Sequence, residues 1–399
     1  VSMSAKLEQN TRLNVAVIGV GIMGSSHVKD IATLPNTRLM AVCDIRKERA
    51  DAFAAQYGVP AFYEYRHLLQ LPDLQGIVIA TPHYDHTPIS IEALQRGIHV
   101  MVEKPIAVHA KDARKMIEAY EHAKAQYPNL VFAAMFMCRT YGYYRKIKEL
   151  IDDGELGKLT RVTWILTDWF RTQAYYDHGD WRATWRGEGG GVLLNQCPHN
   201  LDLYQWFFGM PQRITGFASI GKYHNIEVED EVTAYFEHES GMVGHFITTT
   251  GESPGTNRLE IAGEQGKLVF EDGKITFYRN RQSMFEFIRT SKAAFDRVEH
   301  WVMDIPYTHH GQGGHRIALE NFANAALHGE SLIAPAVEGI RELTIGNAIM
   351  LSSFRKQTVE MPFDEQAYDA LLQELIRTSR YQKTVQDQVI SDLEKSFHA

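Results

Sequence analysis

Residues 13–24 read LNVAVIGVGIMG, and this stretch decides the fold of the first part of the chain. Its beginning is an almost continuous apolar run, which is typical of a strand buried on both faces in a parallel sheet. The run leads into the pattern G-x-G-x-x-G at 19–24, and Asp44 follows twenty residues after Gly24, at the end of the next predicted strand. A buried strand, this glycine pattern, a helix and then an acidic residue together predict a Rossmann-type dinucleotide site.

Each part of the glycine pattern has a physical task in such a site. Gly19 permits the tight turn, Gly21 lets the backbone approach the pyrophosphate, and Gly24 lets the helix pack closely on the strand. The helix start, with Ile22 and Met23, offers free backbone N–H groups and a partial positive charge to the phosphates. We therefore predict that 19–24 binds a nicotinamide dinucleotide.

Asp44 indicates which dinucleotide is bound. Its carboxylate would accept hydrogen bonds from both hydroxyls of the adenosine ribose, and it would repel the 2′-phosphate of NADP. This favours NAD. Arg46 and Lys47 lie just beyond and would offset part of that repulsion, so NADP stays an alternative.

Alternating strands and helices continue to about residue 138 and predict a doubly wound parallel sheet over 12–138. The predicted strands after the first are 38–43, 76–80, 99–102 and 131–135. The predicted helices are 23–33, 47–57, 88–96 and 110–125, with a short helical turn at 65–69.

After Cys138 the pattern changes to long β-rich runs with hairpin-type turns such as Asp272-Gly273. The runs are 159–170, 213–219, 231–238, 243–250, 259–262, 267–271 and 275–278, and the helices are 144–152, 198–208, 316–327, 336–355 and 364–379. We predict an α+β substrate-binding and oligomerisation domain with a large, mostly antiparallel sheet over 139–380. A polar C-terminal tail follows at 381–399.

Composition narrows the class of protein. A net charge of −8 argues against a nucleic-acid partner, which requires a basic face. No run reaches the roughly 18 apolar residues of a membrane-spanning helix, and residues 1–12 lack the apolar core of a signal peptide. The three cysteines, Cys43, Cys138 and Cys197, are far apart, which predicts a reduced, cytoplasmic protein without disulfides or structural zinc.

Two further segments carry candidate catalytic residues. Lys104, in Glu103-Lys104-Pro105, follows a predicted strand and would face the crevice at the carboxyl end of the sheet. The triple glycine 189–191 precedes Asn195 and His199, which would share a helical face unless Pro198 starts or kinks a helix there. Side chains cannot fill the space at three glycines, so we expect a ligand beside them.

These motifs occur in one order, together with Thr81-Pro82 and His86, and over about 12–380 the chain resembles the glucose–fructose oxidoreductase / inositol dehydrogenase family (Gfo/Idh/MocA). The resemblance implies that the cofactor site includes Thr81, Pro82, His86, Glu103 and Lys104. It also implies a homo-oligomer, a dimer or tetramer.

In that family a lysine, an aspartate and a histidine four residues later act on sugar or cyclitol hydroxyls. Lys104 and His199 match the first and last, whereas position 195 is Asn. Oxidation of a secondary alcohol needs a general base, and His199 is the natural candidate for acid and base. Lys104 would stabilise charge on the reacting oxygen. Asn195 cannot take a proton and would position the substrate or hold Lys104.

Candidate substrate contacts combine aromatic faces with charged donors, which suits a polyhydroxylated ring. The residues are Arg171, Tyr175, Arg182, Trp185 and His315. A metal site at His309, His310 and His315 is disfavoured, because no carboxylate or cysteine stands at ligand spacing and glycines flank these histidines. Asp202 is read either as orienting the His199 helix or as a cap or interdomain contact.

We therefore predict an NAD-dependent oxidoreductase that moves hydride to or from a ring carbon of a sugar, anhydrosugar, glycoside or cyclitol. An alternative keeps NAD tightly bound in a transient redox cycle that cleaves glycosides. The presence of Asn at position 195, in place of Asp, supports this alternative, in which Tyr175 or Tyr176 would supply the acid. A third interpretation, a non-catalytic NAD-binding regulator, fits poorly because Lys104 and His199 are both present.

Overall fold

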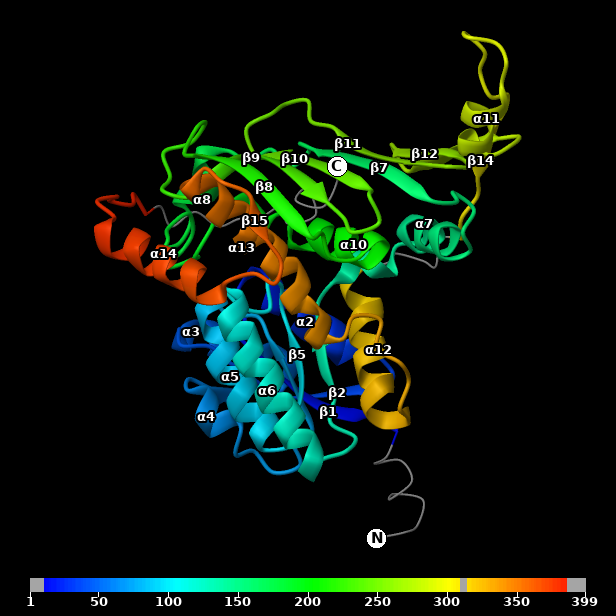
Figure 1. Ribbon diagram of the computed structural model, residues 1–399. Helices are drawn as coiled ribbons and strands as arrows, with labels where there is room; N and C mark the ends of the chain where they lie inside the picture. The colour runs from blue at the N-terminus through cyan, green and yellow to red at the C-terminus, as the bar shows by residue number, and fades with distance from the viewer. Residues whose placement is uncertain (1–10, 309–313, 386–399) are drawn as a thin grey trace.

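The computed structural model describes residues 11–308 and 314–385, which form two sheets, each with its own helices (Figure 1). The first sheet is parallel and has the strand order β3-β2-β1-β4-β5-β6. Its strands are β1 (Leu13–Ile18), β2 (Thr37–Cys43), β3 (Ala61–Phe62), β4 (Gly76–Ile79), β5 (His99–Val102) and β6 (Phe132–Ala134). The strand order reverses between β1 and β4, where doubly wound folds bind their ligands. The predicted Rossmann domain is confirmed.

Helices cover both faces of this sheet. They are α2 (Ile22–Thr33), α3 (Lys47–Tyr57), α4 (Tyr65–Leu68), α5 (His83–Gln95) and α6 (Ala110–Gln126). The predicted start of α5 at Pro88 is wrong, because the helix already begins at His83. An interior proline costs about 3 kcal/mol. Here the ring of His83 lies 3.1 Å from the carbonyl of Glu188, and the ring of His86 contacts two other carbonyls, so tertiary contacts hold the first turn.

The glycine loop requires glycine at two positions. Gly19 has φ +85°, and a Cβ there would lie 2.6 Å from the carbonyl oxygen of Ala80. A Cβ on Gly24 would lie 1.8 Å from the carbonyl oxygen of Gly19. The start of α2 therefore packs on the end of β1 as closely as the sequence pattern predicts.

The second sheet has the strand order β14-β13-β12-β11-β7-β10-β9-β8-β15. Its strands are β7 (Leu159–Leu166), β8 (Arg213–Ile220), β9 (Glu229–Glu237), β10 (Val243–Thr249), β11 (Asn257–Gly263), β12 (Gly266–Glu271), β13 (Lys274–Asn280), β14 (His300–Ile305) and β15 (Val359–Glu360). All neighbouring pairs are antiparallel except β7 with β10, which is parallel. The mostly antiparallel sheet is confirmed, although β14 and β15 were not predicted and β7 ends at Leu166, before the expected residue 170.

The helices of the second domain lie mainly on the sheet face that is turned toward the Rossmann domain (Figure 1). They are α7 (Gly142–Asp152), α8 (Gln173–Asp177), α9 (Val192–Asn195), α10 (Pro198–Phe208), α11 (Met284–Thr290), α13 (Gly339–Arg355) and α14 (Glu365–Thr378), with 3₁₀ turns η1 (Met137–Thr140) and η2 (Ala336–Glu338). Helix α13 packs tightly on β8, since a Cβ on Gly216 would lie 2.6 Å from the carbonyl oxygen of Ile349. A continuous buried apolar cluster joins Val102 of β5 to Trp164 of β7, so the two domains share one core.

Helix α12 (His315–His328) belongs in space to the Rossmann domain, although it lies far along the chain. Leu319 and Phe322 are buried in one cluster with Val15 and Val17 of β1. This helix completes a core that began some 300 residues earlier in the sequence.

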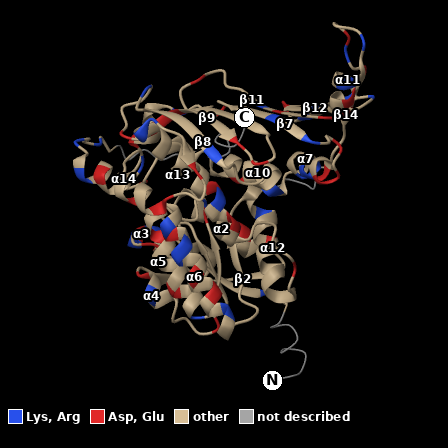
Figure 2. Cartoon of the chain, viewed as in Figure 1, with Lys and Arg blue, Asp and Glu red and all other residues tan. Residues whose placement is uncertain are grey.

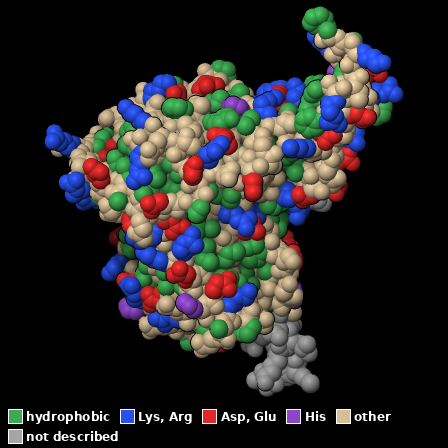
Figure 3. Space-filling view, in the orientation of Figure 1, with side chains coloured by type: hydrophobic (Ala, Val, Ile, Leu, Met, Phe, Trp, Pro, Cys, Tyr) green, Lys and Arg blue, Asp and Glu red, His purple; other side chains and the backbone are tan. Residues whose placement is uncertain are grey.

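An arm formed by α11, the connection 291–299 and the start of β14 projects from the edge of the second sheet (Figure 1). Helix α11 has no buried residue. Phe295 is 99% exposed and Trp301 55% exposed, and apolar side chains are visible along the arm (Figure 3). Elsewhere acidic and basic residues alternate over the surface helices (Figure 2). Among the described residues, no helix has the length and apolar character that crossing a membrane requires.

Candidate active site

Lys104 follows β5 and reaches across to the second domain. Its Nζ donates a hydrogen bond to the backbone carbonyl of Asn195 at 2.7 Å. Burial lowers the pKa of this ammonium group. The peptide bond from Lys104 to Pro105 is cis. A backbone group of one domain thus orients the candidate catalytic lysine of the other.

His199 lies in the first turn of α10, which Pro198 begins. Its ring packs edge-on against Phe136, with centroids 6.3 Å apart, and the residue is only 2% exposed. Neither ring nitrogen has a hydrogen-bond partner among the described residues. Burial, and then the positive charge of Lys104, lower the pKa of His199 well below its usual value. The imidazole is therefore neutral near neutral pH and has a nitrogen available to take a proton.

Asn195 and His199 do not share one helix. Helix α9 ends at Asn195, and α10 starts at Pro198, so the expected common helical face is interrupted. The side chain of Asn195 donates to Glu188, while its backbone carbonyl holds Lys104. The physical reason for the break is Pro198, which has no N–H to continue α9 and is favourable at a helix start.

The triple glycine does not leave an open space, which corrects the expectation of a ligand beside it. A Cβ on Gly189 would lie 2.3 Å from Val108, and one on Gly191 would lie 2.0 Å from the carbonyl oxygen of Glu229. The glycines allow this loop to pack directly on β9. The Glu229 carboxylate accepts hydrogen bonds from the N–H groups of Gly191 and Leu193 at 2.9 and 3.0 Å.

A buried pair that the sequence reasoning missed supports the Glu103-Lys104 turn. His27, on the inner side of α2, lies with its Nε2 2.7 Å from Oε1 of Glu103. The other carboxylate oxygen accepts the backbone N–H of Lys104 at 3.0 Å. Burial raises the pKa of Glu103, but the hydrogen bond from His27 and the nearby positive charges outweigh it and bring the pKa to about 2. The signal was available, because His27 comes three residues after Gly24, on the helix face turned to the sheet.

His315 lies beside this pair. Its ring centroid is 5.4 Å from that of His27. Burial lowers the pKa of His315 to about 4. The structure thus brings the start of α12 to the same cluster as Lys104 and His199, as expected for a residue of the site.

The residues around the glycine loop fit a dinucleotide. Oδ2 of Asp44 accepts the N–H of Val20 at 3.0 Å, and Oδ1 accepts the N–H of Arg46 at 2.9 Å. A Cβ on Gly21 would meet only the Arg49 guanidinium, at 3.6 Å, so the backbone there is open to a close approach. Arg49 also lies 3.6 Å from Asp44 and was missed as a cation beside the ribose position.

Thr81 and His86 complete the cofactor side of the site. The hydroxyl of Thr81 is buried and has no hydrogen-bond partner among the described residues, which suits a group that a ligand would satisfy. The ring nitrogens of His86 lie 2.8 Å from the carbonyl of Pro105 and 3.0 Å from that of Thr81. His86 is fully buried, so we assign it to holding these two loops together in place of a direct contact with the cofactor.

Three predicted substrate residues of the second domain, Arg171, Tyr175 and Arg182, lie against one another. The Arg182 guanidinium stacks on Tyr175 at 4.7 Å and on Trp181 at 4.5 Å, and it donates to the Tyr175 hydroxyl at 2.9 Å. Arg171 lies over the same Tyr175 ring at 5.2 Å. Trp185 is different, since it is 4% exposed and packs in the core, which corrects its predicted role.

The described part of the C-terminal tail lies on this cluster. Lys383 donates to the carbonyls of Tyr176 and Arg182, the latter at 2.7 Å. The Tyr381 hydroxyl donates to the carbonyl of Asn225 at 2.8 Å. No sequence pattern marked these contacts, because one lysine in a polar segment resembles any solvated residue.

Asp202 forms a buried contact between segments. It accepts two hydrogen bonds from the Arg139 guanidinium, at 2.6 and 2.7 Å, and Arg139 also pairs with Glu338 at 2.6 Å. Asp202 thus joins α10 to Arg139 of η1, and Arg139 extends the contact to Glu338 of η2, so the group ties together segments of the second domain. Within residues 11–308 and 314–385, no group of three or more His, Cys, Asp or Glu side chains could hold a metal ion. His309 and His310 lie outside the described residues.

Comparison with known proteins identifies two domains of one family. Residues 13–129 match the description "Oxidoreductase family, NAD-binding Rossmann fold", and residues 144–269 match "GFO/IDH/MocA C-terminal domain". The scyllo-inositol 2-dehydrogenase (NAD(+)) of Bacillus subtilis is 24% identical over 86% of this chain and 94% of its own length. The levoglucosan dehydrogenase of Pseudarthrobacter phenanthrenivorans is 24% identical over 88% of this chain and 98% of its own length.

A solved structure agrees with these matches. The WlbA dehydrogenase of Bordetella pertussis, in complex with NADH and UDP-GlcNAcA, has a TM-score of 0.74 and 25% identity, and the match covers 88% of this chain and 100% of that chain. Both domains, their order and the site geometry lead to the same assignment. The chain is a member of the Gfo/Idh/MocA family of NAD-binding oxidoreductases.

Proposed function

We propose that this protein is an NAD-dependent dehydrogenase or ketosugar reductase that acts on a ring carbon of a sugar, anhydrosugar, glycoside or cyclitol. The observation that carries the proposal is His199, a buried histidine whose two ring nitrogens have no hydrogen-bond partner in the described part of the chain and which lies under the electrostatic influence of Lys104. A neutral base beside a cation suits removal of a proton from an alcohol whose oxygen gains negative charge.

The chemistry divides between cofactor and protein. Bound NAD supplies the hydride acceptor for oxidation of the alcohol. Lys104 donates a hydrogen bond to the reacting oxygen, and His199 takes the hydroxyl proton at a ring nitrogen. The alcohol becomes a ketone, and the proton leaves from His199 to solvent. In reduction His199 returns the proton to the oxygen. Asn195 keeps Lys104 aimed through its backbone carbonyl.

The substrate class is supported by the residues beyond His199 and by the relatives. Arg171, Tyr175 and Arg182 offer aromatic faces and charged donors to a polyhydroxylated ring. The relatives are named for scyllo-inositol and levoglucosan, a cyclitol and an anhydrosugar. A polar ring of this size is therefore the first substrate to offer.

A screen of sugars, glycosides, anhydrosugars and cyclitols tests the proposal. Each is incubated with the purified protein and NAD, and ketosugars with NADH, with absorbance of NADH and products by mass spectrometry read together. Accumulation of NADH with one ketone product is the expected result. No absorbance change and no new product with any compound contradicts the proposal.

A transient redox cycle that cleaves glycosides is the second candidate. The Tyr175 hydroxyl oxygen accepts hydrogen bonds from Arg182 and Gln196, at 2.9 and 3.1 Å, which leaves its own proton to donate to a leaving group. In the same screen, release of an aglycone without net NADH identifies this activity. Loss of that release in Tyr175→Phe, with NADH binding unchanged, assigns the acid.

We also propose that the protein assembles as a homo-oligomer through the sheet face that its helices leave open (Figure 1). Large exposed apolar side chains support this, namely Phe217 of β8 in the sheet and Phe295 and Trp301 of the arm, because exposed apolar surface marks association sites. Light scattering on a size-exclusion column should give a multiple of 45.4 kDa. A single 45.4 kDa species at micromolar concentration contradicts it.

A further inference from the structure

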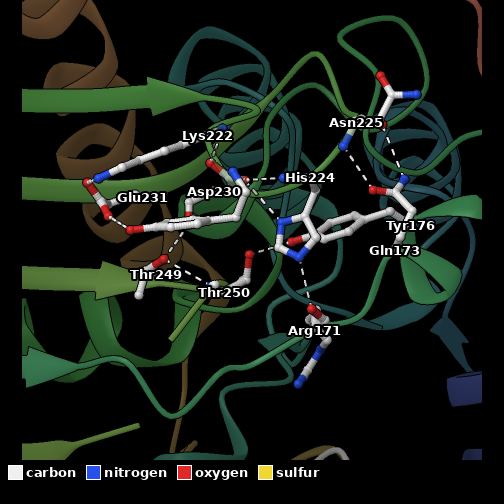
Figure 4. Close-up of polar contacts among 12 residues, drawn as sticks. Arg171, Gln173, Tyr176, Lys222, His224, Asn225, Asp230, Glu231, Thr249 and Thr250 are labelled. Atoms are coloured by element: carbon white, nitrogen blue, oxygen red, sulfur yellow. Dashed lines mark hydrogen bonds and ion pairs between the residues drawn. The ribbon is translucent and has the colours of Figure 1, made fainter. Parts of the chain in front are cut away.

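His224 and Asp230 form a pair beside the segment that carries Arg171 and Tyr175, and this pair has no part in the chemistry described above (Figure 4). The fully buried carboxylate of Asp230 accepts the backbone N–H groups of Lys222, Tyr223 and His224, at 2.8, 2.8 and 3.1 Å. It also contacts Nδ1 of the His224 ring at 3.0 Å. One carboxylate at the start of β9 therefore orders the turn 222–224 and the ring that it carries.

The other edge of the ring reaches the segment 171–176. Nε2 of His224 lies 2.9 Å from the backbone carbonyl oxygen of Arg171, and the ring packs against Tyr176 with centroids 4.8 Å apart (Figure 4). The two ring nitrogens thus face a carboxylate and a carbonyl, which are both acceptors. Only the imidazolium form donates to both.

The segment has further attachments. The backbone N–H of Arg171 donates to the carbonyl of Thr250 at 2.9 Å, and Lys383 donates to the carbonyl of Tyr176. The Tyr176 hydroxyl shares a hydrogen bond with Thr250 at 2.8 Å, and the Gln173 side chain accepts the N–H of Asn225 at 2.8 Å (Figure 4). His224 is the side chain whose Nε2 contacts the carbonyl oxygen of Arg171 at the start of the segment.

We propose that His224 is a positioning residue: as an imidazolium bonded to Asp230 and to the Arg171 carbonyl, it fixes the segment that presents Arg171 and Tyr175 to the substrate. This rests on the proposed function, because it assumes that these two side chains contact a sugar or cyclitol. His224 itself touches no reacting atom. Its effect is on substrate binding and not on the chemical step.

The arrangement makes substrate binding depend on pH. Burial lowers the pKa of His224, but its hydrogen bonds to Asp230 and to the Arg171 carbonyl outweigh burial and raise the pKa above its usual value. The ionisable groups around it are Asp230 from β9, Arg171 and Tyr176 from the segment, and Lys222, which pairs with Glu231. Positioning is complete at a pH below about 6.5 and is lost as the pH rises through the raised value.

Two variants test the role of the ring. His224→Phe keeps the packing on Tyr176 and removes both hydrogen bonds. His224→Gln keeps a donor for the Arg171 carbonyl but cannot titrate. His245→Phe is the control, since His245 lies in the same sheet and packs on Tyr235 at 5.3 Å, outside this network. KM for the substrate found in the screen, kcat, and NADH binding by fluorescence are measured from about pH 6 to about pH 9.

In the wild type and in His245→Phe, KM should rise with pH. In His224→Phe, KM at low pH should be at least tenfold higher than in the wild type and should not change with pH. In His224→Gln, KM should stay near the low-pH value of the wild type at every pH. In both variants kcat and NADH affinity should stay within twofold of the wild-type values at the same pH. An unchanged, still pH-dependent KM in His224→Phe overturns the proposal. So does a loss of kcat or of NADH affinity that equals the change in KM.

Hydrogen exchange separates this proposal from the proposed function, because it needs no substrate. Amides of residues 171–177 should exchange faster in His224→Phe than in the wild type at low pH, and the wild type should approach the variant as the pH rises. If no compound is turned over but this difference appears, the proposed function fails and the positioning role stands. If a sugar is turned over and exchange is identical in both proteins, His224 does not position the segment.

Discussion

Lys104 is held in the site by one hydrogen bond, which its ammonium group donates to the backbone carbonyl of Asn195 at 2.7 Å. Lys104→Ala removes the donor that stabilises charge on the reacting oxygen. We expect kcat/KM to fall by about 10²–10³-fold while NADH affinity changes little. Steady-state rates and a fluorescence titration measure the two effects. The control is Lys111→Ala, which removes a surface pair with Asp369. Full turnover in Lys104→Ala would point instead to a lysine that only holds structure.

His199 gives a pH dependence of defined sign. Burial and the charge of Lys104 lower its pKa, so the base stays unprotonated at neutral pH. In the oxidation direction kcat should be level near neutrality and fall as the pH drops through the lowered pKa. Lys104→Ala removes the repelling charge, so the fall of its residual activity should begin at a higher pH. His199→Asn should lose about 10²–10⁴-fold in kcat. A pH profile that does not move in Lys104→Ala contradicts the electrostatic coupling.

Residue types alone revealed part of the site. Lys104, His199 and Asp44 stand in motifs, and the structure brings them to the carboxyl edge of the Rossmann sheet. His27 and Glu188 do not stand in the quoted motifs, and their partners are 76 and 7 residues away. Such pairs form only when the chain has folded, so local spacing can place His27 on the sheet side of α2 but cannot identify Glu103 as its partner. Trp185 shows the opposite error, because a tryptophan beside glycines suggests a sugar contact yet packs in the core.

At the scale of the element, α2 depends on the glycine where it meets β1. In Gly24→Ala the new Cβ would lie 1.8 Å from the carbonyl oxygen of Gly19, so the helix must move away from the strand. We expect the free energy of unfolding to fall by about 1–3 kcal/mol. NADH binding should weaken strongly because the N–H groups of the loop move with the helix. Urea unfolding and fluorescence titration check both.

Gly76→Ala is a matched control in the neighbouring strand β4, where the nearest atom to a new Cβ would be 3.4 Å away, in ordinary contact. It should leave NADH affinity within twofold of the wild type. Equal losses in both variants would mean that any added methyl group in this sheet is disruptive, and that the close approach at Gly24 is not special.

Elements with one buried and one exposed face were predictable, and others were not. The strands β9 and β10 alternate cleanly and were found near their true bounds. Strand β14 has mostly exposed residues, so it shows no such alternation and was missed. The parallel pairing of β7 with β10 joins strands about 80 residues apart, which no local pattern encodes. The start of α5 was misplaced because contacts of His83 and His86 outweigh the proline.

At the scale of the whole molecule, the buried group Arg139, Asp202 and Glu338 links η1, α10 and η2. Asp202→Ala leaves the Arg139 guanidinium with Glu338 as its only carboxylate partner among the described residues. Breaking a buried pair costs about 3–5 kcal/mol, so the free energy of unfolding should drop by that order. Denaturant unfolding measures it.

Glu299→Gln serves as the control for that pair. It breaks the exposed Arg281–Glu299 contact, in which both side chains are more than half exposed. Exposed pairs contribute about 0–1 kcal/mol, so stability should hardly change. If Asp202→Ala is as mild as Glu299→Gln, the buried Arg139–Asp202 pair does not stabilise the second domain.

The late position of α12 in the chain determines when the core of the Rossmann domain can be completed during synthesis. Residues 315–328 leave the ribosome after the whole first sheet and after strands β7 to β14 of the second, at rates of about 5–20 residues per second, so tens of seconds separate them from β1. Through that interval Val15 and Val17 lack the helix that covers them in the native protein. A nascent chain with an uncovered apolar face is a client for chaperones. The nucleotide-binding half is thus the first to be started, yet its core is completed only after most of the second sheet has been synthesised.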